Sequence, residues 1–238
     1  MKVLEKKKIL VVDDEPMLRE ILRDVLEYEG AVVQEAENGR VAFESYRKEG
    51  YHAIISDIRM PGGDGLELLE SLRRLDCVTP VVMLITGFSD LSHDAAYNLG
   101  ADAVLSKPFD VYDLLSRLSF LLTDVDSRWG ARPEGAGNPA QRVIGSCVQS
   151  VGRGGMFVPG FISATTGEGV EFSVDCPKLG GVLEGTGVVR WVRRAASSKL
   201  QDGSGVEFRY LEPQSLERVL EWRRKFPTCA FIPDRNPE

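Results

Sequence analysis

Five polar side chains in the first half of this 238-residue chain stand one or two residues after short apolar runs. They are the carboxylates of Asp13, Asp14 and Asp57, the hydroxyl of Thr86 and the ammonium of Lys107. One aspartate after a strand is usually a helix cap or a turn former, but five such groups are harder to attribute to capping. If the runs are parallel strands, their carboxyl ends meet at one edge of a sheet. We therefore expect the five groups to form one cluster.

Three carboxylates in one cluster would repel one another. This repulsion would raise the pKa of at least one of them unless a divalent cation neutralised the charge. Hard oxygen ligands that leave room for water and phosphate oxygens suit Mg²⁺. The residue types therefore predict a magnesium site at this edge of the sheet.

The elements that would position these groups are legible in the hydrophobic pattern. The apolar runs suited to buried strands cover residues 9–12, 32–33, 53–55, 81–85 and 103–105. Helical patterns lie between them, as in the apolar positions 18, 21, 22, 25 and 26 behind Pro16. Alternation of this kind predicts a parallel sheet with helices on both faces.

Motifs at these strand ends carry a family resemblance. They read VVDDEP at residues 11–16, SDIRMPGGDGLELL at 56–69, TG at 86–87 and KPF at 107–109. In this order they resemble the receiver domain of bacterial response regulators over about residues 6–124. The resemblance implies an α/β fold of the flavodoxin-like (βα)5 type, with strand order 2-1-3-4-5.

The resemblance also implies a role for each polar residue. Asp57 would accept a phosphoryl group from a histidine kinase or a phosphotransfer protein, and Thr86 and Lys107 would contact the phosphoryl oxygens as catalytic groups. Mg²⁺ would be held by the carboxylates of Asp13, Asp14 and Asp57 and by the backbone carbonyl of Arg59. These roles agree with the chemistry, because metal and ammonium charge stabilise the oxygens of a phosphoryl group during in-line transfer.

One position departs from the receiver pattern. Three residues before the lysine, receivers often carry Tyr or Phe, whose ring follows the hydroxyl residue on phosphorylation, whereas this chain has Val104. Phosphorylation could still draw Thr86 inward and shift the face formed by the fourth and fifth helices. We therefore expect signalling through homodimerisation or linker rearrangement on that face.

The chain changes character near residue 124. Residues 1–124 hold 14 Lys and Arg against 23 Asp and Glu, and residues 125–238 hold 15 against 13, so the acidic charge lies in the first part. The second part also holds 16 of the 24 glycines and 8 of the 12 prolines, which favours turn-rich β structure. The predicted domains are residues 1–124 and 142–238, joined by a linker over 125–141 that contains several helix breakers.

The second part has the period of two that half-buried strands show. Apolar residues alternate with polar ones at 170–176 and 206–210, and residues 182–194 supply one or two more strands, interrupted by Gly185 and Gly187. A helix is predicted from about Pro213. The expected architecture is a small antiparallel β-barrel with a C-terminal helix.

Three blocks in this part resemble a PilZ domain over about residues 128–226. They are SVGRGGMFV at 150–158, GVVRWV at 187–192 and GVEFRYLEP at 205–213. The resemblance implies binding of cyclic di-GMP through an R-x-x-x-R motif and a D/N-x-S-x-x-G motif. Guanidinium groups suit this ligand, because they can bond guanine, pair with phosphate and stack on a base.

The two motifs are matched unequally. The ligand-binding candidates are Arg128, Arg132, Ser150, Gly152, Arg153 and Gly155. Arg128 and Arg132 match R-x-x-x-R, but Ser150 stands at the Asp/Asn position and Gly152 at the Ser position. Each missing hydrogen bond would cost about 1–3 kcal/mol. Two interpretations stay open: a nucleotide-binding output domain, or an adaptor that binds an unknown downstream protein when the receiver is phosphorylated.

Other classes of function are disfavoured. No helix-turn-helix pattern follows residue 124, and a net charge of +2 spread over a β-rich part is a poor footprint for DNA. No apolar run is long enough for membrane insertion or for a signal peptide. The length also leaves no room for a cyclase, phosphodiesterase or kinase segment. The expectation is a cytoplasmic signalling protein that is not an enzyme in the metabolic sense.

Overall fold

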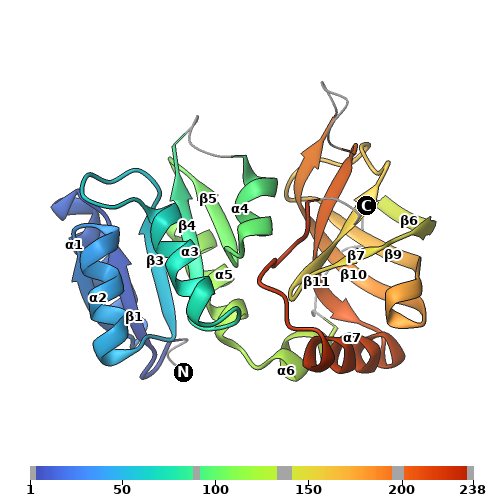
Figure 1. Cartoon of the computed structure of the whole chain (residues 1–238), viewed down its shortest axis with the longest axis horizontal. Helices are drawn as coiled ribbons and strands as arrows, with labels where there is room; N and C mark the ends of the chain where they lie inside the picture. Colours follow the sequence, from blue (N-terminus) through green and yellow to red (C-terminus); the bar gives the residue numbers. More distant parts are fainter. Residues whose placement is uncertain (1–3, 88–91, 133–140, 195–200, 235–238) are drawn as a thin grey trace. The chain divides into compact units, whose positions relative to one another are not determined.

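The computed structural model describes residues 4–87, 92–132, 141–194 and 201–234 (Figure 1). Contacts divide the chain into two compact units. The first comprises Met1–Ser92 and Leu99–Thr123, and the second comprises His93–Asn98 and Asp124–Glu238. No helix in the described part of the chain is long and apolar enough to span a membrane.

The first unit is built on a sheet of five parallel strands in the order β2-β1-β3-β4-β5. The strands are β1 (Lys8–Val12), β2 (Val32–Ala36), β3 (Ala53–Asp57), β4 (Val81–Thr86) and β5 (Ala103–Ser106). The helices that alternate with them in the chain are α1 (Pro16–Tyr28), α2 (Gly39–Glu49), α3 (Gly65–Leu75), α4 (His93–Leu99) and α5 (Val111–Leu122). Of these, α4 follows β4 in sequence, but its residues 93–98 group with the second unit. The predicted alternation and the predicted strand order are both confirmed.

Side-chain caps explain where several of these helices begin. Asn38 accepts a hydrogen bond from the Val41 amide at the start of α2. Asp64 caps α3 in the same way, and Asp110 caps α5. Because the first amides of a helix have no partner inside it, such caps fix the first residue of each helix. They also fix the loops that follow the strands, where the polar cluster was expected.

The second unit contains a sheet of six strands in the order β6-β9-β10-β11-β8-β7. The strands are β6 (Gln141–Cys147), β7 (Ser150–Val151), β8 (Gly155–Pro159), β9 (Gly169–Cys176), β10 (Gly181–Arg193) and β11 (Gly203–Leu211). Two helices belong to this unit in addition to residues 93–98, α6 (Val125–Gly130) and α7 (Pro213–Lys225). The predicted C-terminal helix from Pro213 is confirmed.

The prediction of an antiparallel barrel is wrong in one respect, because β6 pairs parallel with β9. All other pairs in this sheet are antiparallel, and β6 also lies close to β8, so the sheet is mixed and curled. Residues 148–168 give the chain enough length to cross over before β9, which a parallel pair requires. Residues 181–193 form one strand, with a register shift between Thr186 and Gly187 where the sequence predicted an interruption.

The expected linker begins with helix α6. Asp124 caps this helix by accepting from the Asp126 amide, and Trp129 is buried with its ring edge against the Phe208 ring, 5.6 Å between centroids. Burying one large aromatic side chain gives a short helix the tertiary support that it lacks alone. Residues 133–140 of the expected linker lie outside the described residues.

Candidate functional site

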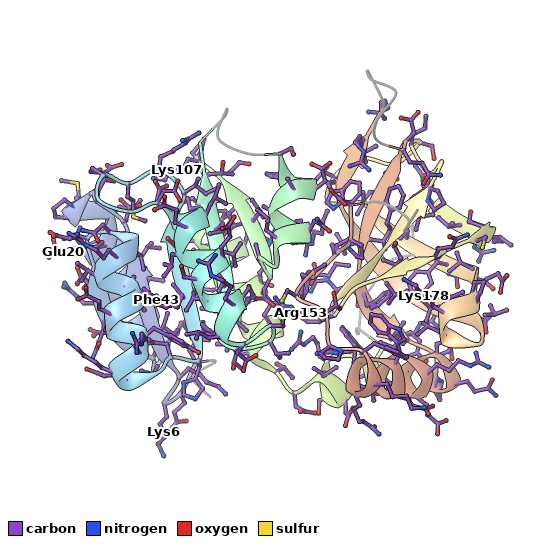
Figure 2. All side chains as sticks on the ribbon, in the orientation of Figure 1. Lys6, Glu20, Phe43, Lys107, Arg153 and Lys178 are labelled. Carbon is purple, nitrogen blue, oxygen red and sulfur yellow. The ribbon has the colours of Figure 1, made fainter. Side chains whose placement is uncertain are left out.

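Asp57 is the last residue of β3, and its side chain is almost entirely buried. The Lys107 ammonium lies 2.8 Å from Asp57 Oδ1, and the Arg59 amide donates to Asp57 Oδ2 at 3.0 Å. Figure 2 labels Lys107 at the edge of the sheet where the parallel strands end. The carboxylate of Asp57 is thus held by a cation on one oxygen and by a loop amide on the other.

Asp13 follows β1 and shares the same cation. Its Oδ2 lies 3.4 Å from Lys107 Nζ, and its Oδ1 accepts from the Glu15 amide at 2.8 Å. Arg19 donates to the Asp13 carbonyl, which ties α1 to this strand end. Asp13 is 1% exposed, whereas Asp14 is exposed to solvent. The structure therefore brings Asp13, Asp57 and Lys107 together and leaves Asp14 at the rim.

Thr86 is the buried last residue of β4. Its hydroxyl donates to the Gly87 carbonyl, and its own carbonyl accepts from the Lys107 amide at 2.8 Å. Thr86 and Lys107 therefore stand on neighbouring strand ends, as the sequence predicted. Val104 is buried within β5. Its effect on the readout of phosphorylation stays a prediction.

Two residues that sequence reasoning missed position Asp57. The Ser56 hydroxyl donates to the Asp57 carbonyl at 2.8 Å. A Cβ at Gly65 would lie 2.2 Å from that same carbonyl oxygen, so only glycine lets the first turn of α3 approach β3 this closely. The glycines of the run PGGDG, which includes Gly65, were the available signal for this contact.

The electrostatics of the site favour an added cation. Burial raises the pKa of Asp57, and the Asp13 charge raises it further, against the opposing effects of Lys107 and the Arg59 amide. Burial lowers the pKa of Lys107, but the Asp57 and Asp13 carboxylates outweigh it and leave the pKa raised. Lys107 is therefore charged, yet the negative charge is incompletely balanced.

These carboxylates fit a magnesium ion as a partial ligand set. Among the described residues, no group of three or more His, Cys, Asp or Glu side chains is arranged as a metal cluster. Asp13 and Asp57 nevertheless supply hard oxygen ligands beside unbalanced negative charge. Mg²⁺ suits such a set, because it commonly takes one or two carboxylates and keeps several waters.

The raised pKa of Asp57 predicts a pH-dependent gain in stability on removing its charge. Below the ordinary aspartate pKa, about 4, the carboxyl is protonated in both the folded and the unfolded chain. As pH rises past this value the unfolded chain ionises first, so the wild-type fold loses stability until pH exceeds the folded pKa. Asp57→Asn should therefore raise the melting temperature at pH 7, and the gain should shrink toward pH 4.

Thermal unfolding followed by circular dichroism at several pH values would measure this gain. Asp24→Asn is the matched control, because Asp24 lies exposed on α1. A melting temperature for Asp57→Asn below that of the wild type at pH 7 would show that pairing with Lys107 outweighs burial.

In the second unit, Arg132 lines a cavity of about 830 Å³. Its guanidinium lies 5.7 Å from the centroid of the Tyr210 ring. The charged residues that share this cavity are Arg142, Arg218, Glu171, Glu184 and Glu212. Arg128 lies on α6, with its guanidinium 5.9 Å from the Trp129 ring centroid. Sequence reasoning missed Arg142 and Arg218, which lie far from Arg132 in sequence and carry no motif.

The second predicted motif lies elsewhere in this unit. Ser150, Gly152, Arg153 and Gly155 are all buried. None of them is among the described residues that line the cavity at Arg132. Instead, residues after α7 cover this turn and hydrogen-bond to it. The structure thus places the two halves of the predicted nucleotide site in different surroundings.

Comparison with known proteins agrees with the resemblance that the sequence motifs of the first part showed. Residues 9–119 match the response regulator receiver domain family. The uncharacterized transcriptional regulatory protein YkoG of Bacillus subtilis is 36% identical over 115 residues, which are 48% of this chain and 50% of YkoG. The chemotaxis protein CheY of Halobacterium salinarum is 32% identical over 117 residues, which are 49% of this chain and 98% of CheY.

Solved structures give matches of the same extent. The response regulator TrrA of Thermotoga maritima, solved in complex with Mg²⁺-BeF, is 36% identical, with a TM-score of 0.45 over 48% of this chain and 98% of TrrA. The receiver domain of the Francisella response regulator 1452 is 26% identical, with a TM-score of 0.46 over 49% of this chain and 97% of that domain.

The extent of these matches separates the two parts of the chain. The chain spans about half the length of the first curated relatives that it matches, which are named as transcriptional regulatory proteins. It spans nearly all of the Halobacterium CheY, at 32% identity. The family match also includes every strand of the first unit and the polar cluster at their ends. The chain therefore belongs to the response regulator receiver family.

Proposed function

We propose that the protein is a cytoplasmic response regulator whose Asp57 accepts a phosphoryl group from a histidine kinase or a phosphotransfer protein. The observation that carries this proposal is the position of Lys107 Nζ, 2.8 Å from Asp57 Oδ1 and 3.4 Å from Asp13 Oδ2. One ammonium thereby orients the acceptor and stands where charge develops on a transferred phosphoryl group.

The proposed transfer uses three groups of this cluster. A carboxylate oxygen of Asp57 attacks phosphorus, the bond from phosphorus to the donor nitrogen breaks, and the histidine imidazole leaves with the electron pair. Lys107 pairs with an oxygen of the moving group, and the Thr86 hydroxyl is the nearby donor on the next strand. Mg²⁺, held by Asp13, Asp14, Asp57 and the Arg59 carbonyl, would neutralise the remaining charge when bound.

Phosphorylation by a small donor tests the proposal. Incubation with acetyl phosphate and Mg²⁺ should add one phosphoryl group per chain, as measured by intact-protein mass spectrometry. Removal of Mg²⁺ by a chelator should reduce the yield at least about tenfold, because the negative charge at Asp13 and Asp57 is then unbalanced. No added mass under any condition would overturn the assignment of Asp57 as an acceptor.

The second unit supports a further candidate function, binding of cyclic di-GMP by a PilZ-like output domain. The favouring observation is the cavity of about 830 Å³ at Arg132, whose volume lies in the usual range of ligand sites. Arg132 lies over the Tyr210 ring, and Arg142 and Arg218 line the same cavity. Such guanidinium groups could pair with the phosphates of a dinucleotide, and Arg128 would add a further charge.

Calorimetric titration separates this function from its alternative, an adaptor that binds a downstream protein without nucleotide. We expect binding of cyclic di-GMP in the micromolar range, weakened at least about tenfold by Arg132→Ala, because an interaction with phosphate is lost. Arg224→Ala is the matched control, since Arg224 is exposed in the last turn of α7. Absence of binding would leave the adaptor as the function of this unit.

A further inference from the structure

The chain returns to the second motif after α7. Residues 227–234, here called the strap, run back along the strands of the second unit (Figure 1). The Arg153 amide donates to the Ala230 carbonyl, and the Gly154 amide donates to the Phe231 carbonyl, both at 3.0 Å. Arg153 Nε also donates to the Cys229 carbonyl, and Figure 2 labels Arg153 beside this segment. The strap therefore accepts hydrogen bonds from the amides of residues 153 and 154 in the turn at residues 152–155, here called the glycine turn.

Side-chain packing makes this contact specific. Phe231 is 1% exposed, and its ring centroid lies 5.2 Å from the Arg153 guanidinium. A Cβ at Gly154 would lie 2.1 Å from atoms of the Phe231 ring, and a Cβ at Gly152 would lie 2.5 Å from the Phe231 carbonyl oxygen. The glycine turn can hold the strap only because these two residues have no side chain. A serine at position 152 would collide with the strap in this position.

The strap is also held on its other side within the second unit. The Phe231 amide donates to the Tyr97 carbonyl at 3.0 Å, and the Phe231 and Tyr97 rings stack at 6.1 Å between centroids. Arg193 donates to the Asp234 carbonyl. Phe231, Ile232 and Asp234 are the buried residues of the strap, and residues 227–234 form no helix or strand. A segment that lies outside the helices and strands can open without unfolding the sheet.

We propose that the strap is a releasable intramolecular ligand of the glycine turn, and that cyclic di-GMP must displace it to use the turn. The nucleotide part of this inference rests on the candidate function proposed above for the second unit. A segment tethered to the same chain competes at high effective concentration. The apparent affinity for the nucleotide is therefore reduced by the fraction of molecules in which the strap is bound.

A wedge variant tests the proposal in the full chain. Gly154→Ala introduces a methyl group where the Phe231 ring lies. Gly154 has no positive φ, so alanine does not strain the backbone there. The motif also allows any residue at position 154. We expect hydrogen exchange at the Arg153 and Gly154 amides to accelerate at least about tenfold. The affinity for cyclic di-GMP should rise by at least about tenfold. Phe231→Ala alone removes the ring that packs on the turn, and it should accelerate the same exchange.

A second experiment removes the strap and adds it back as a peptide, so the test does not depend on the Gly154→Ala substitution alone. A chain that ends at Phe226 lacks the strap, and a chain that ends at Asp234 is its matched control. Cys229 is disulfide-bonded, so all measurements are made in a reducing buffer. A synthetic peptide of residues 227–234 should restore amide protection at Arg153 and Gly154 in the shorter chain and should compete with cyclic di-GMP.

The outcomes separate the two proposals. Equal nucleotide affinity with and without the strap would overturn the competition. If no form of the chain bound cyclic di-GMP, the nucleotide function would be wrong, and peptide rescue would decide on the strap alone. Restored protection would support a releasable ligand. Failure of the peptide to restore protection, or unchanged exchange in both the wedge variant and the truncated chain, would show that the strap is a fixed part of the fold.

Discussion

Asp57→Asn is expected to abolish phosphoryl transfer from acetyl phosphate, to below about 1% of the wild-type yield, because an amide oxygen is not a competent nucleophile. Asparagine keeps the size and shape of the side chain, so Thr86 and Lys107 should stay in place. The neighbouring Asp13 keeps its carboxylate in this variant, so any transfer that remained would reveal a second acceptor. The yield is measured by intact-protein mass spectrometry after incubation with Mg²⁺.

Two controls make this result specific. Asp24→Asn removes an exposed carboxylate on α1 and should leave the yield unchanged. The melting temperature of Asp57→Asn should not fall, so a loss of transfer cannot be attributed to unfolding. Substantial incorporation into Asp57→Asn would mean that another carboxylate is the acceptor.

Arg73→Met is expected to cause the largest loss of stability, about 3–5 kcal/mol in the free energy of unfolding. Arg73 and Asp102 form an ion pair at 2.8 Å in which the side chains are only 4% and 2% exposed. Arg73 also donates to the carbonyls of Gly100 and Pro80, both at 2.9 Å. Removing the guanidinium would leave the buried Asp102 carboxylate and the two carbonyls without this donor.

This pair also supports the candidate site. Asp102 Oδ2 accepts from the Val82 amide, so the pair ties α3 to the beginning of β4 and to the residue before β5. Those two strands lead to Thr86 and Lys107, and a loosened pair should therefore slow phosphorylation as well.

Urea unfolding measures the effect of Arg73→Met. Arg74→Met is the matched control, because the Arg74 side chain is 70% exposed and its ion pair with Glu70 contributes little. Because the two sites are coupled, the double variant with Asp102→Asn should lose less stability than the sum of the single variants. Equal stability of Arg73→Met and Arg74→Met would contradict a structural role for the buried pair.

The polar cluster of the first unit could be predicted because it depends on local signals. Apolar runs identify the strands, and parallel strands bring Asp13, Asp57, Thr86 and Lys107 to one edge whatever the details of packing. The Arg73–Asp102 pair could not be predicted in this way. The two residues are 29 positions apart, and neither belongs to a periodic pattern or a motif.

In the second unit, the local sequence pattern predicted some strands but not their pairing or the segment that covers the motif. Alternation of apolar and polar residues identifies β9 and β11 but is the same for either strand direction, so the parallel pairing of β6 with β9 gave no sequence signal. The motif residues 150–155 were visible, but the segment that covers them was not. Residues 227–234 have no helical or strand period, and their contacts with the glycine turn arise only in the folded unit.

Locating the phosphoryl group in the sequence tests the central claim most directly. Borohydride reduction of the phosphorylated protein converts an acyl phosphate on aspartate to homoserine, and peptide mass spectrometry then identifies the modified position. We predict modification at Asp57 alone, dependent on Mg²⁺ and absent from Asp57→Asn. Modification at Asp13, at Asp14 or at a residue outside this cluster would contradict the account.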